Sequence, residues 1–348
     1  MIVLALACLL GWATPARSAF PIRRPAPEFP EKDAWLNAKP FTLKRLRGRR
    51  AVLVAFINTA NVNSLRAIKV LQAWHERYAL QGLMVIGAHT PAYAFQRNAS
   101  AVDADLRLRG VEFPVILDDD RKLWEGYQNG GWPSFYLVDR KGSVVYEAVG
   151  EMRYSELERE IRTAVGDLGY RVRDAEKLTA ADPPSEDCGS ATPEFSVKSS
   201  KGVEDWDKTT GPTTVISASN EGAIYKVGPW KVDGDALRMT KENPELDSNV
   251  KVVYRGAQGL ALMSSGPMAS TSRVFVKQDD LWLQPRAAGA DVKFDADGRS
   301  FFDVSGPRLY SVAVNVNDNA RLISLTPAAV GAAFYGFSAT DRCLPFLK

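Results

Sequence analysis

Two polar residues, Asn61 and Ser64, follow an apolar run at residues 51–56 and begin a segment with helical periodicity. A pair of cysteines at this spacing could exchange disulfides, because the positive end of a helix lowers the pKa of a thiol. Neither residue carries a thiol, and the Ser64 hydroxyl would need a positioned base to become a nucleophile. We therefore expect no catalytic residue here, and we expect the Asn61 side chain to cap the helix.

The chain has only two histidines that could serve as such a base, His75 and His89. His75 is predicted to lie about three turns along the same helix, beyond reach of Ser64. His89 follows a second predicted strand and is better placed near Asn61. For each, a structural histidine bonded to a carbonyl or carboxylate is the simpler interpretation. Two histidines without a nearby free cysteine give no spacing typical of a zinc or copper site, so we expect neither metal nor cofactor.

The cysteines are Cys8, Cys188 and Cys343. If Cys8 is removed with an N-terminal leader, the two that remain indicate a structural disulfide in an exported chain. That bridge would close a loop of about 150 residues, which contributes about 4 to 5 kcal/mol in the chain-entropy model. A redox-active pair is the alternative interpretation.

The N-terminus predicts export. Residues 1–10 are almost entirely apolar, and the small residues at 13–19 suit cleavage by signal peptidase. Lipidation at Cys8 is a less favoured alternative, because the apolar region before it is short. No later stretch reaches about 18 consecutive apolar residues, so no transmembrane segment is expected. The predicted location is therefore the periplasm or the exterior of the cell.

The charge pattern argues against a nucleic-acid partner. The formal net charge is +3 over 348 residues, and no basic run of the kind that tracks a phosphate backbone is present. Proteins that track a phosphate backbone concentrate lysine and arginine on one surface. We expect an envelope protein, a peptide or a glycan as the partner instead.

Strand and helix patterns alternate through the first half of the chain. The apolar runs at residues 51–56 and 83–88 fit strands buried on both faces, and the first should be central. Further strands are predicted at 114–117, 134–138 and 143–147, the last two forming a hairpin, and helical segments at 64–80, 101–109, 122–127 and 154–168. This order predicts a mixed sheet with helices on both faces.

The second half changes character. Short apolar runs separated by Gly, Pro, Asn and Asp indicate an all-β sandwich, with a jelly roll as the expected form. The runs lie at 249–254, 259–263, 271–276, 292–294, 308–314, 320–325 and 332–337. The predicted organisation is a signal peptide (1–19), a proline-rich lead (20–33), an α/β domain (34–170), a linker (171–187) and a β-sandwich (188–348).

Residues 34–165 resemble the redoxin domain of the DipZ and TlpA-like branch of exported thioredoxin-fold proteins. Asn61-Val62-Asn63-Ser64-Leu65-Arg66 stands where that branch has Cys-Ile-Asn-Cys-Leu-Arg. The other matching segments are 73–78, 87–91 with Phe95, 118–120 and Trp132-Pro133. Segments 191–194, 228–230, 307–310 and 333–337 look like the β-sandwich of DipZ-type proteins, which is often described as carbohydrate-binding-like.

The resemblance implies a thioredoxin-like fold in which the Trp132-Pro133 bond is cis and faces Asn61. It also implies a groove that binds extended peptide without exchanging disulfides. The candidate groove residues are Asn58, Asn61, His89, Trp132 and Pro133. The alternative is that Pro133 only preserves the fold.

The β-sandwich region contains three tryptophans, Trp206, Trp230 and Trp282, which are candidates for a glycan platform. Aromatic faces stack on sugar rings, but large aromatics in a sandwich are core residues more often than binding residues. The sequence does not say which face of the sheets these side chains occupy.

Three functional hypotheses follow. The first is a redox-inactive redoxin-like protein of the cell envelope that binds or scaffolds a protein or glycan. The second is a thiol-disulfide oxidoreductase that acts through Cys188 and Cys343 or together with a partner. The third is a carbohydrate-binding protein in which the redoxin-like domain is a spacer.

Overall fold

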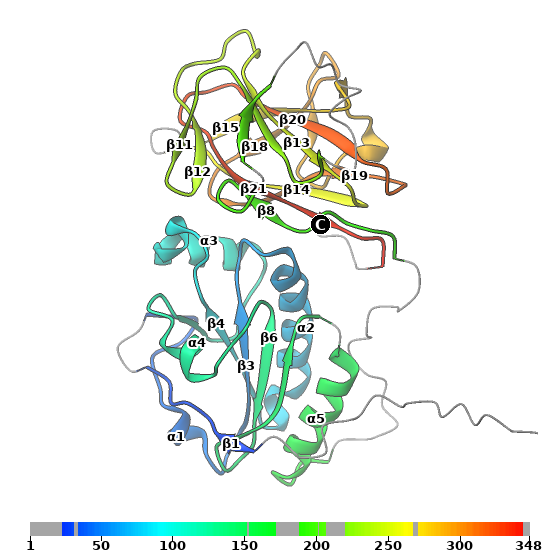
Figure 1. The fold of residues 1–348 in the computed structure, drawn as a ribbon. Helices are drawn as coiled ribbons and strands as arrows, with labels where there is room; N and C mark the ends of the chain where they lie inside the picture. The colour runs from blue at the N-terminus through cyan, green and yellow to red at the C-terminus, as the bar shows by residue number, and fades with distance from the viewer. Residues whose placement is uncertain are drawn as a thin grey trace, which may run out of the picture.

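The computed structural model describes two domains, one stacked on the other (Figure 1). The predicted signal peptide, part of the proline-rich lead and most of the predicted linker lie outside the described residues. The described ranges are 23–30, 34–151, 153–171, 188–200, 202–206, 220–266 and 271–343.

The first domain is built on one mixed sheet with β3 at its centre. β3 is parallel to β4 and antiparallel to β6. The order is β1 (Arg24–Pro25), β7 (Ser143–Val149), β6 (Ser134–Val138), β3 (Ala51–Ile57), β4 (Leu83–His89), β5 (Val115–Leu117) and β2 (Trp35–Leu36). β1 and the buried Phe29 lie within the predicted lead, so the described part of that segment belongs to this domain.

Helices cover both faces of the sheet. Alternate residues of β3 enter two separate clusters, Leu53 on one face and Val54 on the other, which is why the whole run is apolar. Three helices contribute to the Leu53 cluster: α2 (Val62–Tyr78), α3 (Ala99–Leu108) and α5 (Tyr154–Gly166). α1 (Leu43–Leu46) and α4 (Lys122–Gly126) contribute to the Val54 cluster.

A buried carboxylate joins α2 to α5. Glu158 is fully buried and accepts hydrogen bonds from Trp74 Nε1 at 3.0 Å and the Tyr78 hydroxyl at 2.7 Å. Arg162 donates to the same carboxylate at 3.3 Å. A buried charge is tolerated when it is paired and hydrogen-bonded in this way. These contacts hold α2 in place along its last turns.

The second domain is a β-sandwich of two sheets around one core, as predicted. The core includes Val252 from one sheet and Met263 from the other. One sheet contains β17 (Lys293–Phe294), β18 (Ser300–Val304), β15 (Ser272–Gln278), β20 (Arg321–Pro327), β13 (Asn249–Tyr254), β10 (Ile224–Val227) and β9 (Val203–Asp205), with β16 (Leu281–Trp282) beside β15. The other contains β11 (Trp230–Asp233), β12 (Ala236–Met239), β21 (Ala333–Thr340), β14 (Gln258–Ser264) and β19 (Arg308–Val314), with β8 (Phe195–Ser196) beside β21.

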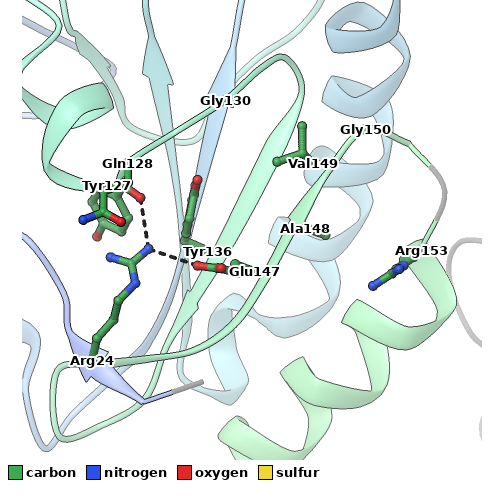
Figure 2. A pocket seen from close by; sticks show the side chains of 10 residues that line it. All are labelled: Arg24, Tyr127, Gln128, Gly130, Tyr136, Glu147, Ala148, Val149, Gly150 and Arg153. Atoms are coloured by element: carbon green, nitrogen blue, oxygen red, sulfur yellow. Dashed lines mark hydrogen bonds and ion pairs between the residues drawn. The ribbon is translucent and has the colours of Figure 1, made fainter. Parts of the chain in front are cut away.

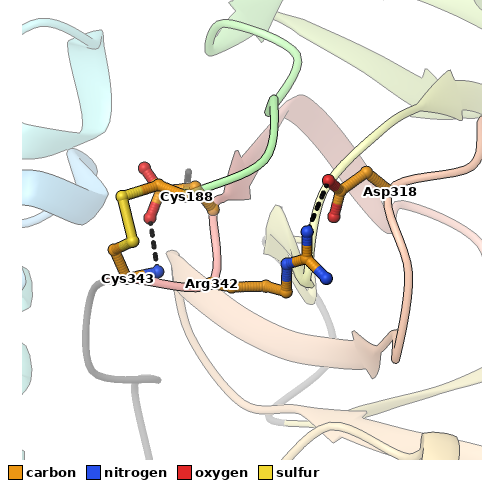
Figure 3. The surroundings of a disulfide bond; sticks show 5 residues. Cys188, Asp318, Arg342 and Cys343 are labelled. Carbon is orange, nitrogen blue, oxygen red and sulfur yellow. Dashed lines mark hydrogen bonds and ion pairs between the residues drawn. A yellow bond between two sulfur atoms is a disulfide. The ribbon is translucent and has the colours of Figure 1, made fainter. Parts of the chain in front are cut away.

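A disulfide joins Cys188 to Cys343, near the two ends of the described part of this domain (Figure 3). The Arg342 N–H donates to the Cys188 carbonyl at 3.1 Å. The Arg342 guanidinium also pairs with Asp318 at 3.1 Å. The bridge therefore ties the end of β21 to the segment that leads into β8.

The two domains share a continuous apolar contact through the sheet that contains β14 and β21. Ala261 and Met263 of β14 face the sandwich core, whereas Leu260 and Leu262 belong to the core cluster of the first domain. Tyr335 of β21 joins the same cluster. Both faces of this sheet are consequently buried at β14, which explains the unbroken apolar run there.

Candidate functional site

Asn61 is the N-cap of α2, which confirms the predicted capping role. Its Oδ1 accepts a hydrogen bond from the Ser64 N–H at 2.9 Å. Its Nδ2 donates to Glu194 Oε2 of the second domain at 3.2 Å. The Asn61 side chain is thus engaged at both of its polar atoms.

Ser64 has no activating base. The residue is fully buried, and its Oγ has no hydrogen-bond partner. Neither histidine therefore contacts it. His75 lies on α2 with its ring 6.2 Å from that of Phe113.

A buried polar network lies beneath the start of α2. Asn58 and Gln96 exchange amide hydrogen bonds at 2.8 and 3.2 Å, and Asn58 Nδ2 also donates to the Thr90 carbonyl at 2.9 Å. His89 is fully buried, and its Nε2 lies 3.3 Å from the Thr59 hydroxyl. Burial lowers the pKa of His89 to about 4, so the ring is neutral at pH 7.

The Trp132–Pro133 peptide bond is cis. Pro133 is buried, and its carbonyl accepts a hydrogen bond from the Gly150 N–H at 2.8 Å. The Trp132 ring packs on Trp124 with a centroid separation of 4.7 Å. Asn58 and His89 are also buried, so Asn61 and Trp132 are the predicted groove residues that keep some exposure.

A buried ion pair supports α2 one turn after its start. Arg66 Nη2 donates to Glu151 Oε2 at 2.7 Å, and both side chains are almost entirely buried. Burial raises the pKa of Glu151, and the Arg66 guanidinium opposes that shift. This pair fixes the direction of the Arg66 side chain away from solvent.

The second domain covers the face of the first domain on which Asn61 lies. Asp235 accepts a hydrogen bond from the Ala94 N–H at 2.7 Å and forms an ion pair with Lys198. Tyr335 packs against Phe95, with ring centroids 4.9 Å apart. The contact thus combines Asn61 with residues 93–95, which lie around η2 (Ala94–Arg97).

Glu194 is a second acidic residue at this contact, in addition to Asp235. Part of its side chain is exposed, but the protein around its carboxylate raises the pKa to about 7. Hydrogen bonds with Ser338 and Asn61 oppose that shift. Glu194 therefore changes its charge near neutral pH while it accepts a hydrogen bond from Asn61.

The three predicted glycan-platform tryptophans do not converge. Trp230 is buried in the sandwich core. Trp206 and Trp282 lie at β9 and β16, which are separated in the sheet order by β10, β13, β20 and β15. A lysine stacks on each partly exposed ring, Lys251 on Trp206 at 4.8 Å and Lys277 on Trp282 at 4.4 Å.

Glu194, Asp235 and Tyr335 were not predicted as site residues. A usable signal was present at residues 259–263, where both alternate sets of side chains are apolar. In a sandwich with one solvent-facing side, alternate residues should be polar. The pattern therefore indicated that a second surface covers this sheet, although it did not identify that surface.

Residues 23–164 match the Redoxin family. The first domain is a redoxin domain. Its mixed sheet, with helices on both faces, is the expected thioredoxin-like arrangement, and Asn61 and Ser64 lie at the start of α2. Neither of these two residues carries a thiol.

Comparison with known proteins gives relatives of the redoxin domain. Protein DipZ of Mycobacterium tuberculosis is 34% identical over 172 residues, which cover 49% of this chain and 25% of DipZ. Thiol-disulfide oxidoreductase YkuV of Bacillus subtilis is 22% identical over 146 residues, covering 42% of this chain and 97% of YkuV. The solved thiol-disulfide isomerase from Corynebacterium glutamicum is 22% identical, with a TM-score of 0.37, and the match covers 40% of this chain and 96% of that one. The chain spans about a quarter of the length of the DipZ proteins that it matches.

Proposed function

We propose that this protein is a redox-inactive redoxin-domain protein of the cell envelope that binds or scaffolds a protein or glycan partner. The observation that carries the proposal is the double role of Asn61. Its side chain caps α2 and donates to Glu194 of the β-sandwich. A side chain with no ionisable proton thus bonds to the second domain at the position where the resemblance places a redox cysteine, which would need to be a thiolate.

The cover over Asn61 supports the same proposal. An exchange reaction requires a protein disulfide to approach the nucleophile in line with its sulfur atoms. Glu194 contacts Asn61 directly, and Asp235 and Tyr335 contact residues 94 and 95 beside it. The β-sandwich therefore restricts approach from this direction.

Export is part of the proposal and rests on the leader pattern of residues 1–19, which lie outside the described residues. Among the helices that the structure describes, none is long and apolar enough to cross a membrane.

An insulin-reduction assay tests the proposal. The protein without residues 1–19 is incubated with insulin and dithiothreitol, and precipitation of the insulin B chain is followed. We expect the insulin to precipitate at the same rate as with dithiothreitol in the absence of the protein. Turnover above that rate would contradict the proposed lack of redox activity.

The second candidate function is disulfide exchange through Cys188 and Cys343. The specific observation in its favour is that both bridged residues are partly exposed, so a thiolate could reach the bond. Cys188→Ser with Cys343→Ser separates the candidates in the same assay. Activity that disappears in this variant would assign the reaction to the bridge.

A glycan partner has its own test. Retention of the protein on immobilised cell-wall polysaccharide is compared with that of Trp206→Ala and Trp282→Ala. Because a lysine covers each ring, sugar stacking requires these lysines to move. Equal retention of all three proteins would remove these two tryptophans as a glycan platform.

A further inference from the structure

One edge of β7 is open along half of its length. On one side, β7 pairs with β6 as far as Val149. On the other side, β1 pairs only with Ser143 and Val144. Within the ranges that the structure describes, no strand pairs with this second edge between Tyr146 and Val149.

The backbone groups on the open edge belong to Glu147 and Val149. The Gly150 N–H donates toward β6, to the Pro133 carbonyl. Backbone groups of successive residues in an antiparallel strand face opposite edges. Ala148 therefore faces β6, and Glu147 and Val149 direct their N–H and C=O groups outward. Such an edge is a template for another strand.

A cavity of about 530 Å³ lies beside this edge (Figure 2). Its walls come from β7, from the loop that precedes the cis-proline and from two arginines, Arg24 and Arg153. Figure 2 shows the two arginines at opposite ends, with the β7 residues between them. Val149 is 61% exposed at this edge, so its side chain is accessible to an apolar side chain of a ligand.

The charges of the cavity favour an acidic ligand at one end. The Arg24 guanidinium donates to the Tyr127 carbonyl and to Glu147 Oε2, both at 3.0 Å. Arg24 therefore compensates the charge of Glu147. Arg153 is the second positive side chain of the lining and lies at the other end, where Tyr146 also experiences the charges of Glu156 and Glu160 on α5. A carboxylate is the complementary group.

We propose that the open edge of β7 binds an extended peptide. The peptide adds as a strand against Glu147 and Val149, packs an apolar side chain on Val149 and places a carboxylate near Arg153. This surface includes neither Asn61 nor Ser64. The inference therefore goes beyond the proposed function and does not depend on the absence of redox activity.

The first test leaves the protein unchanged and alters the ligand. The probe is a fluorescent hexapeptide that alternates valine and threonine and ends in glutamate, and its anisotropy is measured with the full chain. We expect saturable binding, and we expect N-methylation of alternate peptide nitrogens to weaken it about tenfold or more, because the donors of the strand pairing are lost. Equal binding of the methylated probe would overturn the proposal.

The second test alters the edge. Val149→Pro removes the outward N–H without removing a donor to β6, and proline is tolerated at such edge positions. We expect about a tenfold loss of affinity, whereas the control Val149→Thr, which keeps the N–H, should lose less. Circular dichroism checks that both variants are folded. Unchanged affinity in a folded Val149→Pro protein would contradict strand addition.

The third test concerns charge and place. Arg153→Glu should reverse the preference for a peptide that ends in glutamate over one that ends in lysine. Arg159→Glu, on the exposed surface of α5, should leave that preference unchanged.

A variant at the predicted groove tests the location of the site. Asn61→Ser, which retains a capping side chain, should leave peptide binding unchanged. Loss of binding in Asn61→Ser with normal binding in Val149→Pro would place the peptide at the predicted groove and overturn the assignment to β7.

Discussion

Asn61 and Glu194 link the start of a helix in one domain to the edge of the other. Asn61 Oδ1 accepts from the Ser64 N–H at 2.9 Å, and Asn61 Nδ2 donates to Glu194 Oε2 at 3.2 Å. An amide can do both because it has an acceptor and donors on one group. Cysteine at this position would satisfy neither contact well, since sulfur is a weak partner in hydrogen bonds.

Asn61→Ala should destabilise the chain by about 1 kcal/mol through loss of the helix cap, with a further loss from the bond to Glu194. Urea unfolding measures the change. Asn61→Ser is the matched control, because its hydroxyl keeps the cap while the shorter side chain no longer reaches Glu194. Equal stability of the alanine variant and the unaltered protein would show that neither bond contributes.

Glu194 should make the stability of the chain fall as pH rises. Its pKa in the folded chain is about 7, above its ordinary value of 4.5, so the folded state binds the additional proton between these limits. The contribution is present below about pH 4.5 and is lost as pH rises through about 7. The measurement is the free energy of unfolding from pH 4.5 to 8. Relative to the unaltered protein, Glu194→Gln should lose no stability between about pH 4.5 and 7, so its profile should rise more with pH.

His89 gives the opposite dependence and must be separated from Glu194. Its pKa falls from 6.5 to about 4 in the folded chain, so stability is present above about pH 6.5 and is lost as pH falls toward 4. Subtracting the Glu194→Gln profile from that of the unaltered protein removes the His89 contribution. A difference that does not vary with pH would contradict the raised pKa of Glu194.

Asn61→Cys with Ser64→Cys should restore a thiol pair at the start of α2. The helix N-terminus favours the thiolate at position 61, whereas the nearby Glu194 carboxylate opposes it. We expect rapid reaction with dithiothreitol and some reduction of insulin, and the additional change Glu194→Gln should lower the thiol pKa. A disulfide that forms but exchanges with neither reagent would show that the surrounding site has diverged.

Cys188→Ser should destabilise the β-sandwich. The bridge joins residues 155 positions apart, and the chain-entropy model assigns about 4 to 5 kcal/mol to such a loop. Thermal unfolding should show a lower Tm for the second domain, and Cys343→Ser should match it. The double variant should equal either single variant, because each one already removes the whole bridge. A larger effect in the double variant would indicate a separate role for a free thiol.

Local sequence patterns determined much of the fold and part of the site. The apolar run at 51–56 identified β3, because a central strand must be apolar on both faces. The polar residue before the helical pattern identified Asn61 as the cap of α2. The missing thiols are a property of the sequence alone. β10 to β12 and β18 were not identified, because short strands with mixed composition give little periodic signal.

Only the tertiary structure decided what lies over Asn61 and which side chains are accessible. Glu194 is 133 residues away from it along the chain, so no local pattern relates the two. Asn58 follows the end of β3 and His89 is the last residue of β4, where a groove residue would lie, yet both are buried in one polar network with Thr59 and Gln96. Exposure is set by the whole surrounding surface, whereas a cap or a buried strand is set by a few neighbouring residues.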